Sequence, residues 1–97
     1  MAFIQIIEFT TSDIDAVQAI DEEWLKATEG KRTARREILT RDRNNPDRYF
    51  SLVFFDSYES AMENSQLPET QAGAEKYRAS TKDVAFYDLD VVSEYAV

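Results

Sequence analysis

The segment "YFSLVFFD", from Tyr49 to Asp56, is the part of this chain that indicates its architecture most clearly. Successive side chains of a β-strand point to opposite faces of the sheet. One face of this strand would carry Tyr49, Ser51, Val53 and Phe55, and the other would carry Phe50, Leu52 and Phe54. Both faces are apolar, so a second layer must cover each of them. The architecture of the protein therefore depends on which two layers cover these faces.

The length and composition predict one folded domain over residues 1–97. Apolar residues make up 43% of the chain and charged residues 31%, as in ordinary globular proteins. The N-terminal "MAFIQIIEF" has no basic flank and contains Glu8, so it predicts a strand and not a signal sequence. No apolar run approaches the roughly 20 residues that a membrane span requires. We therefore expect a cytoplasmic protein with no membrane partner.

The chain contains no cysteine and no histidine. The first absence excludes disulfides, thiolate nucleophiles and zinc–thiolate sites. The second removes the usual general base near neutral pH, the usual haem ligand and most transition-metal chemistry. We therefore expect no metal and no cofactor, and any catalysis must use carboxylates, Tyr, Lys, Arg, Asn or the substrate itself.

The net charge of −8 is unevenly distributed along the chain. Residues 26–48 hold eight of the 11 basic side chains and four acidic ones, so the rest of the chain is strongly acidic. Clustered arginines such as those in "KRTARRE" can contact nucleic-acid phosphates. The acidic remainder of the surface would repel a polyanion, however, so we expect no nucleic-acid partner.

Secondary-structure signals follow one another in the order βαββαβ. Strands are predicted over residues 3–9, 33–43, 49–56 and 83–95. A first helix is predicted between Ser12 as N-cap and Gly30 as the stop signal. A second helix should begin after Asp56 or Ser57, break at "NSQLP", and resume at Pro68 to end near residue 79. The sequence "DRNNPDR" predicts a hairpin turn between the two middle strands.

Asp21 stands out in the first helix. At 100° per residue it falls within the apolar face, beside Val17 and Trp24. A carboxyl in that position would be partly desolvated, and its pKa would rise. Two interpretations remain open: Asp21 lies at the rim and reaches water or an arginine, or it faces into a pocket.

The element order predicts an α+β fold of the ferredoxin-like βαββαβ type, an antiparallel sheet with two helices on one face. The other face of the sheet is left uncovered. Each large apolar side chain left in water forgoes about 1.5 to 3 kcal/mol of burial free energy. A second copy of the same sheet is the simplest cover, so we expect a homodimer with its sheets packed face to face.

Three features resemble a known family: the element order, the hairpin region "DRNNPDRYFSLVFFDSYESAMEN", and the broken helix "NSQLPETQAGAEKY". Together they are similar to the dimeric α+β barrel superfamily, and most of all to its antibiotic biosynthesis monooxygenase (ABM) branch. The resemblance covers nearly the whole chain. It implies that the end of the last strand pairs with the partner's sheet. Asp88, Asp90 and Glu94 would then lie near the basic second strand of the other chain.

The resemblance also implies chemistry. Cofactor-independent oxygenases of this family bind a flat aromatic substrate between the helices and the sheet, and the substrate anion itself reacts with oxygen. The haem-degrading branch uses an Asn on the first strand and a Trp and a His on the second helix. This chain offers Gln5 or Glu8 on the first strand, has Asn64 near the Trp position, and has no His. Haem degradation is therefore not expected.

A pocket of this kind would use two candidate catalytic residues, Asp21 as the proton acceptor and Asn64. The candidate substrate-binding residues are Gln5, Trp24, Tyr49, Phe54 and Tyr87. Each also has a structural interpretation, because aromatic side chains often fill a core, a Gln can bond to a neighbouring strand, and an Asn can cap a helix. Two functions remain open: a cofactor-independent monooxygenase acting on a small aromatic or polyketide-like molecule, and a non-catalytic dimeric module that binds a small ligand or helps to build an assembly.

Overall fold

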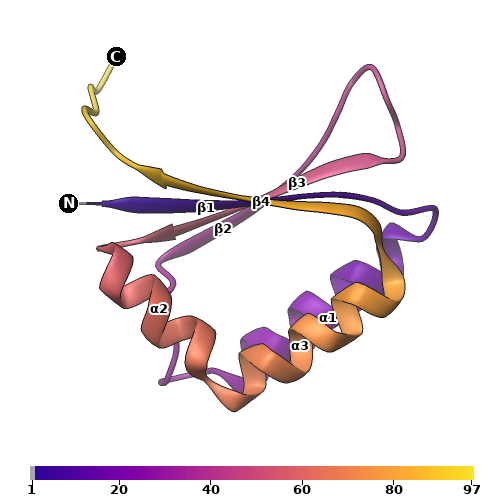
Figure 1. The fold of residues 1–97 in the computed structure, drawn as a ribbon, viewed down its shortest axis with the longest axis horizontal. Helices are drawn as coiled ribbons and strands as arrows, with labels where there is room; N and C mark the ends of the chain where they lie inside the picture. The colour runs from indigo at the N-terminus through magenta and orange to yellow at the C-terminus, as the bar shows by residue number, and fades with distance from the viewer. Residues whose placement is uncertain (1) are drawn as a thin grey trace.

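The computed structural model describes residues 2–97 as a four-stranded antiparallel sheet with three helices packed on one side (Figure 1). The strands lie in the order β2-β3-β1-β4. The elements are β1 (Phe3–Thr10), α1 (Ile14–Ala27), β2 (Arg36–Arg41), β3 (Arg48–Phe55), α2 (Tyr58–Gln66), α3 (Pro68–Ser80) and β4 (Lys82–Asp90). The predicted α+β, ferredoxin-like architecture is confirmed. We call the side of the sheet that meets the helices the helix face, and the other side the open face.

The alternation predicted for the central segment is visible in the burial of β3. Tyr49, Ser51, Val53 and Phe55 are buried on the helix face, while the residues between them are half-buried on the open face. The strand is held in the middle of the sheet, antiparallel to both β1 and β2. Its helix-face side chains therefore enter the core of the domain.

Two apolar clusters form that core. The first joins Phe3, Val53 and Phe55 to Ala61 of α2. The second joins Phe9, Val17 and Tyr49, and Tyr77 of α3 packs against it. The Phe9 and Tyr49 rings stack with their centroids 5.6 Å apart, and the Tyr77 ring meets Phe9 edge-on at 5.2 Å. Together the two clusters hold the three helices against the sheet.

The boundaries of α1 differ slightly from the prediction. Its N-cap is Asp13 and not Ser12, because the Asp13 carboxylate accepts a hydrogen bond of 3.2 Å from the backbone N–H of Ala16. The helix ends at Ala27, and Gly30 follows with a φ of 79°. This left-handed conformation suits glycine, so the predicted stop signal lies just beyond the last helical turn.

Two strands are shorter than predicted. β2 begins at Arg36, because the backbone N–H of Thr33 donates to the side chain of Asn64 in α2 instead of joining a strand. β4 ends at Asp90, and residues 91–97 curve away from the sheet without regular secondary structure (Figure 1). Within this segment, Val92 and Tyr95 are 92% and 80% exposed, whereas Val91 is half-buried.

The predicted break in the second helix is confirmed. α2 ends at Gln66, Leu67 adopts an extended conformation, and Pro68 occupies the first turn of α3. Proline is favoured there because its missing N–H would have no helical partner. The break lets α2 and α3 cross the sheet in different directions, and it places Asn64 in the last turns of α2, where it is buried.

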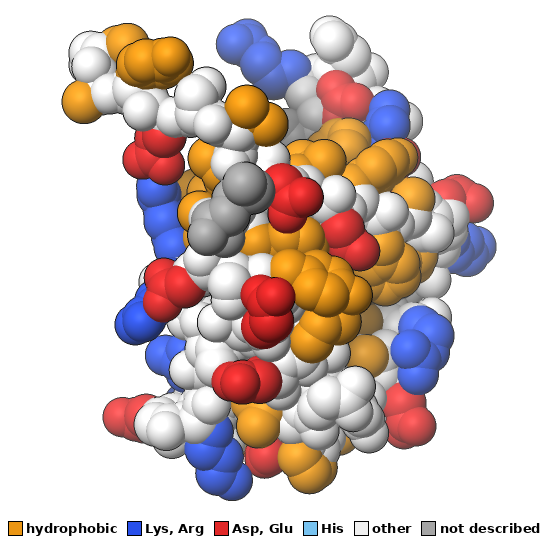
Figure 2. Space-filling model, turned by 60° about the vertical axis from the view of Figure 1, so that its left-hand side comes forward, with side chains coloured by type: hydrophobic (Ala, Val, Ile, Leu, Met, Phe, Trp, Pro, Cys, Tyr) orange, Lys and Arg blue, Asp and Glu red, His pale blue; other side chains and the backbone are white. Residues whose placement is uncertain are grey.

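Nothing within residues 2–97 covers the open face of the sheet. Its apolar side chains are half-buried or exposed, and they include Ile4, Ile6, Ile38, Phe50, Leu52, Phe54, Tyr87 and Leu89. Glu8 and Arg48 form an ion pair of 2.8 Å on this face, and Tyr87 donates a hydrogen bond to Glu8. Hydrophobic and acidic side chains are interspersed on the side of the molecule that Figure 2 presents.

Candidate active site

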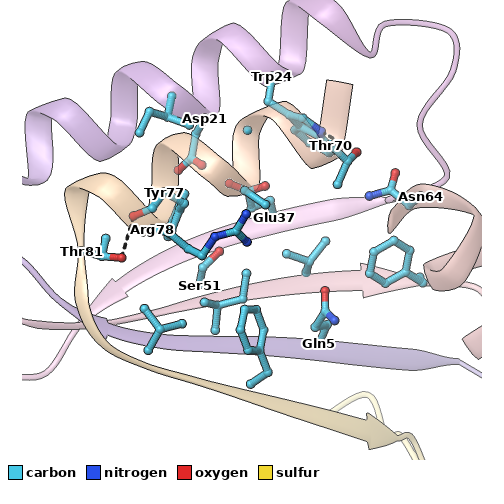
Figure 3. A pocket seen from close by; sticks show the side chains of 18 residues that line it. Gln5, Asp21, Trp24, Glu37, Ser51, Asn64, Thr70, Tyr77, Arg78 and Thr81 are labelled. Atoms are coloured by element: carbon cyan, nitrogen blue, oxygen red, sulfur yellow. Dashed lines mark hydrogen bonds between the residues drawn. The ribbon is translucent and has the colours of Figure 1, made fainter. Parts of the chain in front are cut away.

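A cavity of about 150 Å³ lies between the helices and the helix face of the sheet. All four strands and all three helices contribute to its walls, which are mostly apolar. The polar side chains on the walls are Gln5, Asp21, Glu37, Ser51, Asn64, Thr70, Tyr77, Arg78 and Thr81 (Figure 3). Phe86 lines the cavity while 63% of its surface is exposed, so the cavity reaches solvent beside β4.

Asp21 of α1 and Glu37 of β2 form a carboxyl pair on the cavity wall. Burial, followed by the charge of Glu37 and a hydrogen bond to it, raises the pKa of Asp21 to about 7. Burial also raises the pKa of Glu37, whereas the charge of Arg32 and the hydrogen bond from Asp21 lower it. Asp21 is therefore the member that holds its proton more tightly, and it changes charge near neutral pH.

Tyr77 of α3 contributes a third oxygen near this pair. Its hydroxyl is buried and has no hydrogen-bond partner within residues 2–97. Burial raises the pKa of Tyr77, and the charges of Asp21 and Glu37 raise it further. The hydroxyl therefore stays protonated and is available as a donor.

Trp24 closes the cavity from the side of α1. Its indole N–H donates a hydrogen bond of 2.9 Å to the hydroxyl of Thr70 on α3. Gly73, one turn further along α3, lies beside the ring, and a Cβ there would make an ordinary van der Waals contact with it at 3.8 Å. The Arg32 guanidinium lies over the ring at 5.9 Å from its centroid, and it donates a hydrogen bond to the carbonyl of Leu25.

Asn64 faces the cavity from α2 and lies apart from the carboxyls of Asp21 and Glu37 (Figure 3). Its side-chain oxygen accepts a hydrogen bond of 3.2 Å from the backbone N–H of Thr33. No hydrogen bond from its amide nitrogen to another residue is found in residues 2–97. Asn64 therefore anchors the segment before β2, and its N–H₂ group remains available to a ligand oxygen.

The structure places four of the seven sequence-predicted site residues on the cavity wall. Asp21, Trp24 and Asn64 line it from the helices, and Gln5 lines it from β1. The Gln5 amide also donates a 3.4 Å hydrogen bond to Asp88 on the neighbouring strand. The cavity thus brings together side chains from three separate elements.

The other three predicted residues, Tyr49, Phe54 and Tyr87, do not line this cavity. Phe54 and Tyr87 belong to the open face, because their strand positions have the opposite parity to those of the buried side chains. Tyr49 is on the helix face, but Phe9 stacks against its ring and Arg41 donates to its hydroxyl at 3.0 Å. It therefore belongs to the core beyond the end of the cavity.

Sequence reasoning missed Glu37, Tyr77 and Arg78 as wall residues. Glu37 shares the helix face of β2 with Leu39 and Arg41. The alternation of side chains along the predicted strand could therefore have placed Glu37 on the side of the helices. Tyr77 lies within the region correctly predicted as the second helical piece. No sequence pattern singled out Arg78, which is exposed at the rim.

Within residues 2–97 there is no group of three or more side chains arranged to hold a metal ion. No helix in the same part of the chain has the length and apolarity needed to cross a membrane.

No protein-family model and no curated protein matches the sequence. Solved structures do match the fold. SnoaB, a cofactor-independent oxygenase from Streptomyces nogalater, superposes with a TM-score of 0.80 at 12% identity, over 96% of this chain and 95% of its own. Rv0793 from Mycobacterium tuberculosis gives a TM-score of 0.79 at 14% identity, over 99% and 100% of the two chains. An antibiotic biosynthesis monooxygenase gives 0.74 at 15% identity, over 96% and 100%.

The chain has the ABM fold. The resemblance inferred from the hairpin and the broken helix is therefore confirmed at the level of architecture. Because the identities are this low, the ABM likeness establishes the fold and leaves the activity to be argued from the cavity.

Proposed function

We propose that this protein is a cofactor-independent monooxygenase that acts on a small aromatic molecule bound in the cavity. One observation carries the proposal: an ionisable carboxyl, Asp21, lies on the wall of a mostly apolar cavity, and its pKa is raised to about 7. A general base works best when its pKa lies near the working pH. Apolar walls with a few polar groups are the usual character of a site for an aromatic ligand.

The proposed reaction starts with proton transfer from the substrate to the Asp21 carboxylate. The substrate anion then donates electrons to molecular oxygen, and a carbon–oxygen bond forms to give a peroxide. Cleavage of the O–O bond leaves one oxygen atom in the product as a carbonyl and releases the other as water. The substrate is oxidised by loss of two hydrogens and gain of one oxygen, and oxygen is the only oxidant consumed.

Other wall residues have proposed roles in this reaction. The free N–H₂ group of Asn64 would donate to an oxygen of the substrate or peroxide, where negative charge develops. The ring of Trp24, fixed by its hydrogen bond to Thr70, would provide a flat wall for the aromatic ring. Gln5 would orient a polar substituent from the side of the sheet.

We further propose that the functional unit is a homodimer with the open faces packed together. The apolar side chains of the open face would otherwise lose burial free energy of about 1.5 to 3 kcal/mol each. The exposed segment 91–97 and the acidic end of β4 would extend along the partner's basic β2. The ion pair of Glu8 and Arg48 gives this apolar face a charged group that is already paired.

The second candidate is a non-catalytic dimeric module that binds a small ligand. The hydrogen bond between Asn64 and Thr33 favours it, because this bond gives Asn64 a structural reason to be buried. The cavity would then serve for binding alone.

Oxygen consumption distinguishes the two candidates. We expect the protein to consume oxygen with a member of a panel of hydroxylated aromatics, at a rate that rises with pH through about 7 as Asp21 loses its proton. Asp21→Asn should lower the rate at least about 100-fold, the usual contribution of a general base. Glu22→Gln, on the exposed side of the same helix, is the matched control and should not change the rate. Binding without oxygen uptake across the panel would favour the module.

A further inference from the structure

Three of the polar side chains on the cavity wall belong to three different elements. They are Asp21 from α1, Glu37 from β2 and Tyr77 from α3. The carboxyls interact with each other, whereas the Tyr77 hydroxyl is buried with no partner in residues 2–97. A buried hydroxyl without a hydrogen bond is rare and destabilising, so it requires an explanation. A ligand oxygen next to Tyr77 would supply the missing partner.

Building on the proposed function, we propose that the cavity binds a single-ring hydroxyarene, with the ligand's hydroxyl held by Asp21, Glu37 and Tyr77. The ionised carboxyl of the pair accepts the ligand's O–H, and the Tyr77 hydroxyl donates to the same ligand oxygen. Tyr77 and Glu37 thereby join Asp21 as the residues that determine specificity.

The size of the cavity limits the ligand to about one ring. Its volume of about 150 Å³ equals that of an engineered protein cavity that holds benzene. A fused three-ring molecule would have to displace side chains or extend into solvent past Phe86. Ile7, Ile20 and Val53 supply aliphatic walls against which one aromatic ring can pack.

The charges around the cavity favour a neutral ligand with a hydroxyl donor. Two carboxyls would repel an anion such as a carboxylic acid in its ionised form. Arg78 at the rim and Arg32 near Glu37 disfavour a cation. Burial raises the pKa of Glu37, while the charge of Arg32 and the hydrogen bond from Asp21 act in the opposite direction and favour its ionised form. Glu37 is therefore the carboxyl of the pair that accepts the ligand's O–H while Asp21 carries its proton, whereas turnover needs ionised Asp21.

Calorimetric titration tests this inference without turnover. The probes are 4-methylphenol, its methyl ether 4-methylanisole, benzylamine, and the three-ring 1-hydroxyanthracene. We expect 4-methylphenol to bind at least about tenfold more tightly than the ether, because the ether leaves the polar groups of the site unpaired. Equal affinity for phenol and ether, or tighter binding of benzylamine or of the three-ring probe, would overturn the proposal.

Tyr77→Phe gives the sharpest variant test. It removes an oxygen that has no partner, so the urea midpoint of the free protein should be unchanged or higher, while the affinity for 4-methylphenol falls about fivefold or more. A lower midpoint with unchanged affinity would show a structural role and contradict the proposal. Tyr58→Phe, at a site 50% exposed at the start of α2 and away from the cavity, is the matched control. Glu37→Gln should weaken phenol binding similarly, and Glu22→Gln should not.

The two proposals can fail separately. If 4-methylphenol binds as expected but no hydroxyarene supports oxygen uptake, the monooxygenase proposal fails and the binding site stands. If oxygen uptake occurs with larger substrates while single-ring phenols do not bind, the monooxygenase proposal stands and this inference fails.

Discussion

The indole N–H of Trp24, on α1, donates a 2.9 Å hydrogen bond to the hydroxyl of Thr70, on α3. This bond joins two helices that are far apart in the chain, because β2, β3 and α2 lie between them. It also fixes the ring that closes one wall of the cavity (Figure 3). The wall of the candidate site is therefore held by a tertiary contact and not by local helix geometry.

Removing this contact should both destabilise the fold and loosen the wall. Thr70→Val keeps the shape of the side chain but leaves the half-buried indole N–H without its acceptor, at a cost of about 1 to 3 kcal/mol in the free energy of unfolding. Urea denaturation measures that cost, and the emission of the chain's one tryptophan reports the new environment. Thr70→Ser retains the hydroxyl and should lie close to wild type. Equal destabilisation by both variants would contradict the assigned role of the bond.

Asp21 should make the folded protein less stable as the pH rises. Its pKa is raised from 3.8 to about 7 on folding, so the folded state binds this proton more tightly than the unfolded state. The stabilisation is complete below pH 4 or so and is lost as the pH rises to about 7, after which it changes no further. In urea denaturation series from pH 5 to pH 8, Asp21→Asn should reduce this downward slope. An unchanged slope would mean that Asp21 is not buried as described.

The stability of variants at Gly30 should depend only on how readily the new residue adopts the left-handed backbone conformation. The φ of Gly30 is 79°, and a Cβ at this position would meet no atom within 4 Å. Gly30→Ala should therefore cost about 1 kcal/mol through left-handed backbone strain. Gly30→Asn should cost less, because asparagine adopts this conformation more readily. Thermal denaturation of the two variants measures the difference, and an alanine variant as stable as wild type would show that the turn relaxes.

The open face should determine the oligomeric state. We expect the wild type to have twice the chain mass of 11.2 kDa in solution. Leu52→Glu places a charge in the middle of the open face and should shift the protein to a monomer, because burying an unpaired carboxylate is costly. Leu25→Glu, the same change at a site of α1 that is 40% exposed, should leave the dimer intact. Light scattering after size-exclusion chromatography reads both results, and a wild-type monomer would refute the dimer.

The sequence alone was sufficient to predict the architecture. The alternation within residues 49–56 and the turn before them predicted the central hairpin, and the burial of β3 follows that alternation. The signals for the helix break at Pro68 were equally local. Strand ends were less predictable: β2 begins late because Thr33 bonds to Asn64, a contact between residues far apart in the chain.

Part of the site could also be predicted from local sequence patterns. Asp21 was identified because a carboxylate within an apolar helical face is conspicuous, and the structure places it on the cavity wall. Phe54 and Tyr87 were grouped with the pocket for their aromatic character, although strand parity assigns them to the open face. Glu37 was missed because its strand also carries Arg36 and Arg41, so one more charged residue there gives no contrast. Glu37 matters to the site because it interacts with Asp21. This contact joins β2 to α1, so it appears only in the tertiary structure.

The most direct test of the proposed function is the fate of labelled oxygen. The protein would be incubated under ¹⁸O₂ with the hydroxylated aromatic that supports oxygen uptake, or with 4-methylphenol if none has been found, and the product analysed by mass spectrometry. We expect one ¹⁸O atom in each product molecule and none above background with Asp21→Asn. An aromatic that binds in the cavity and is recovered without label would contradict the proposed function, and would leave the chain as a ligand-binding module with the ABM fold.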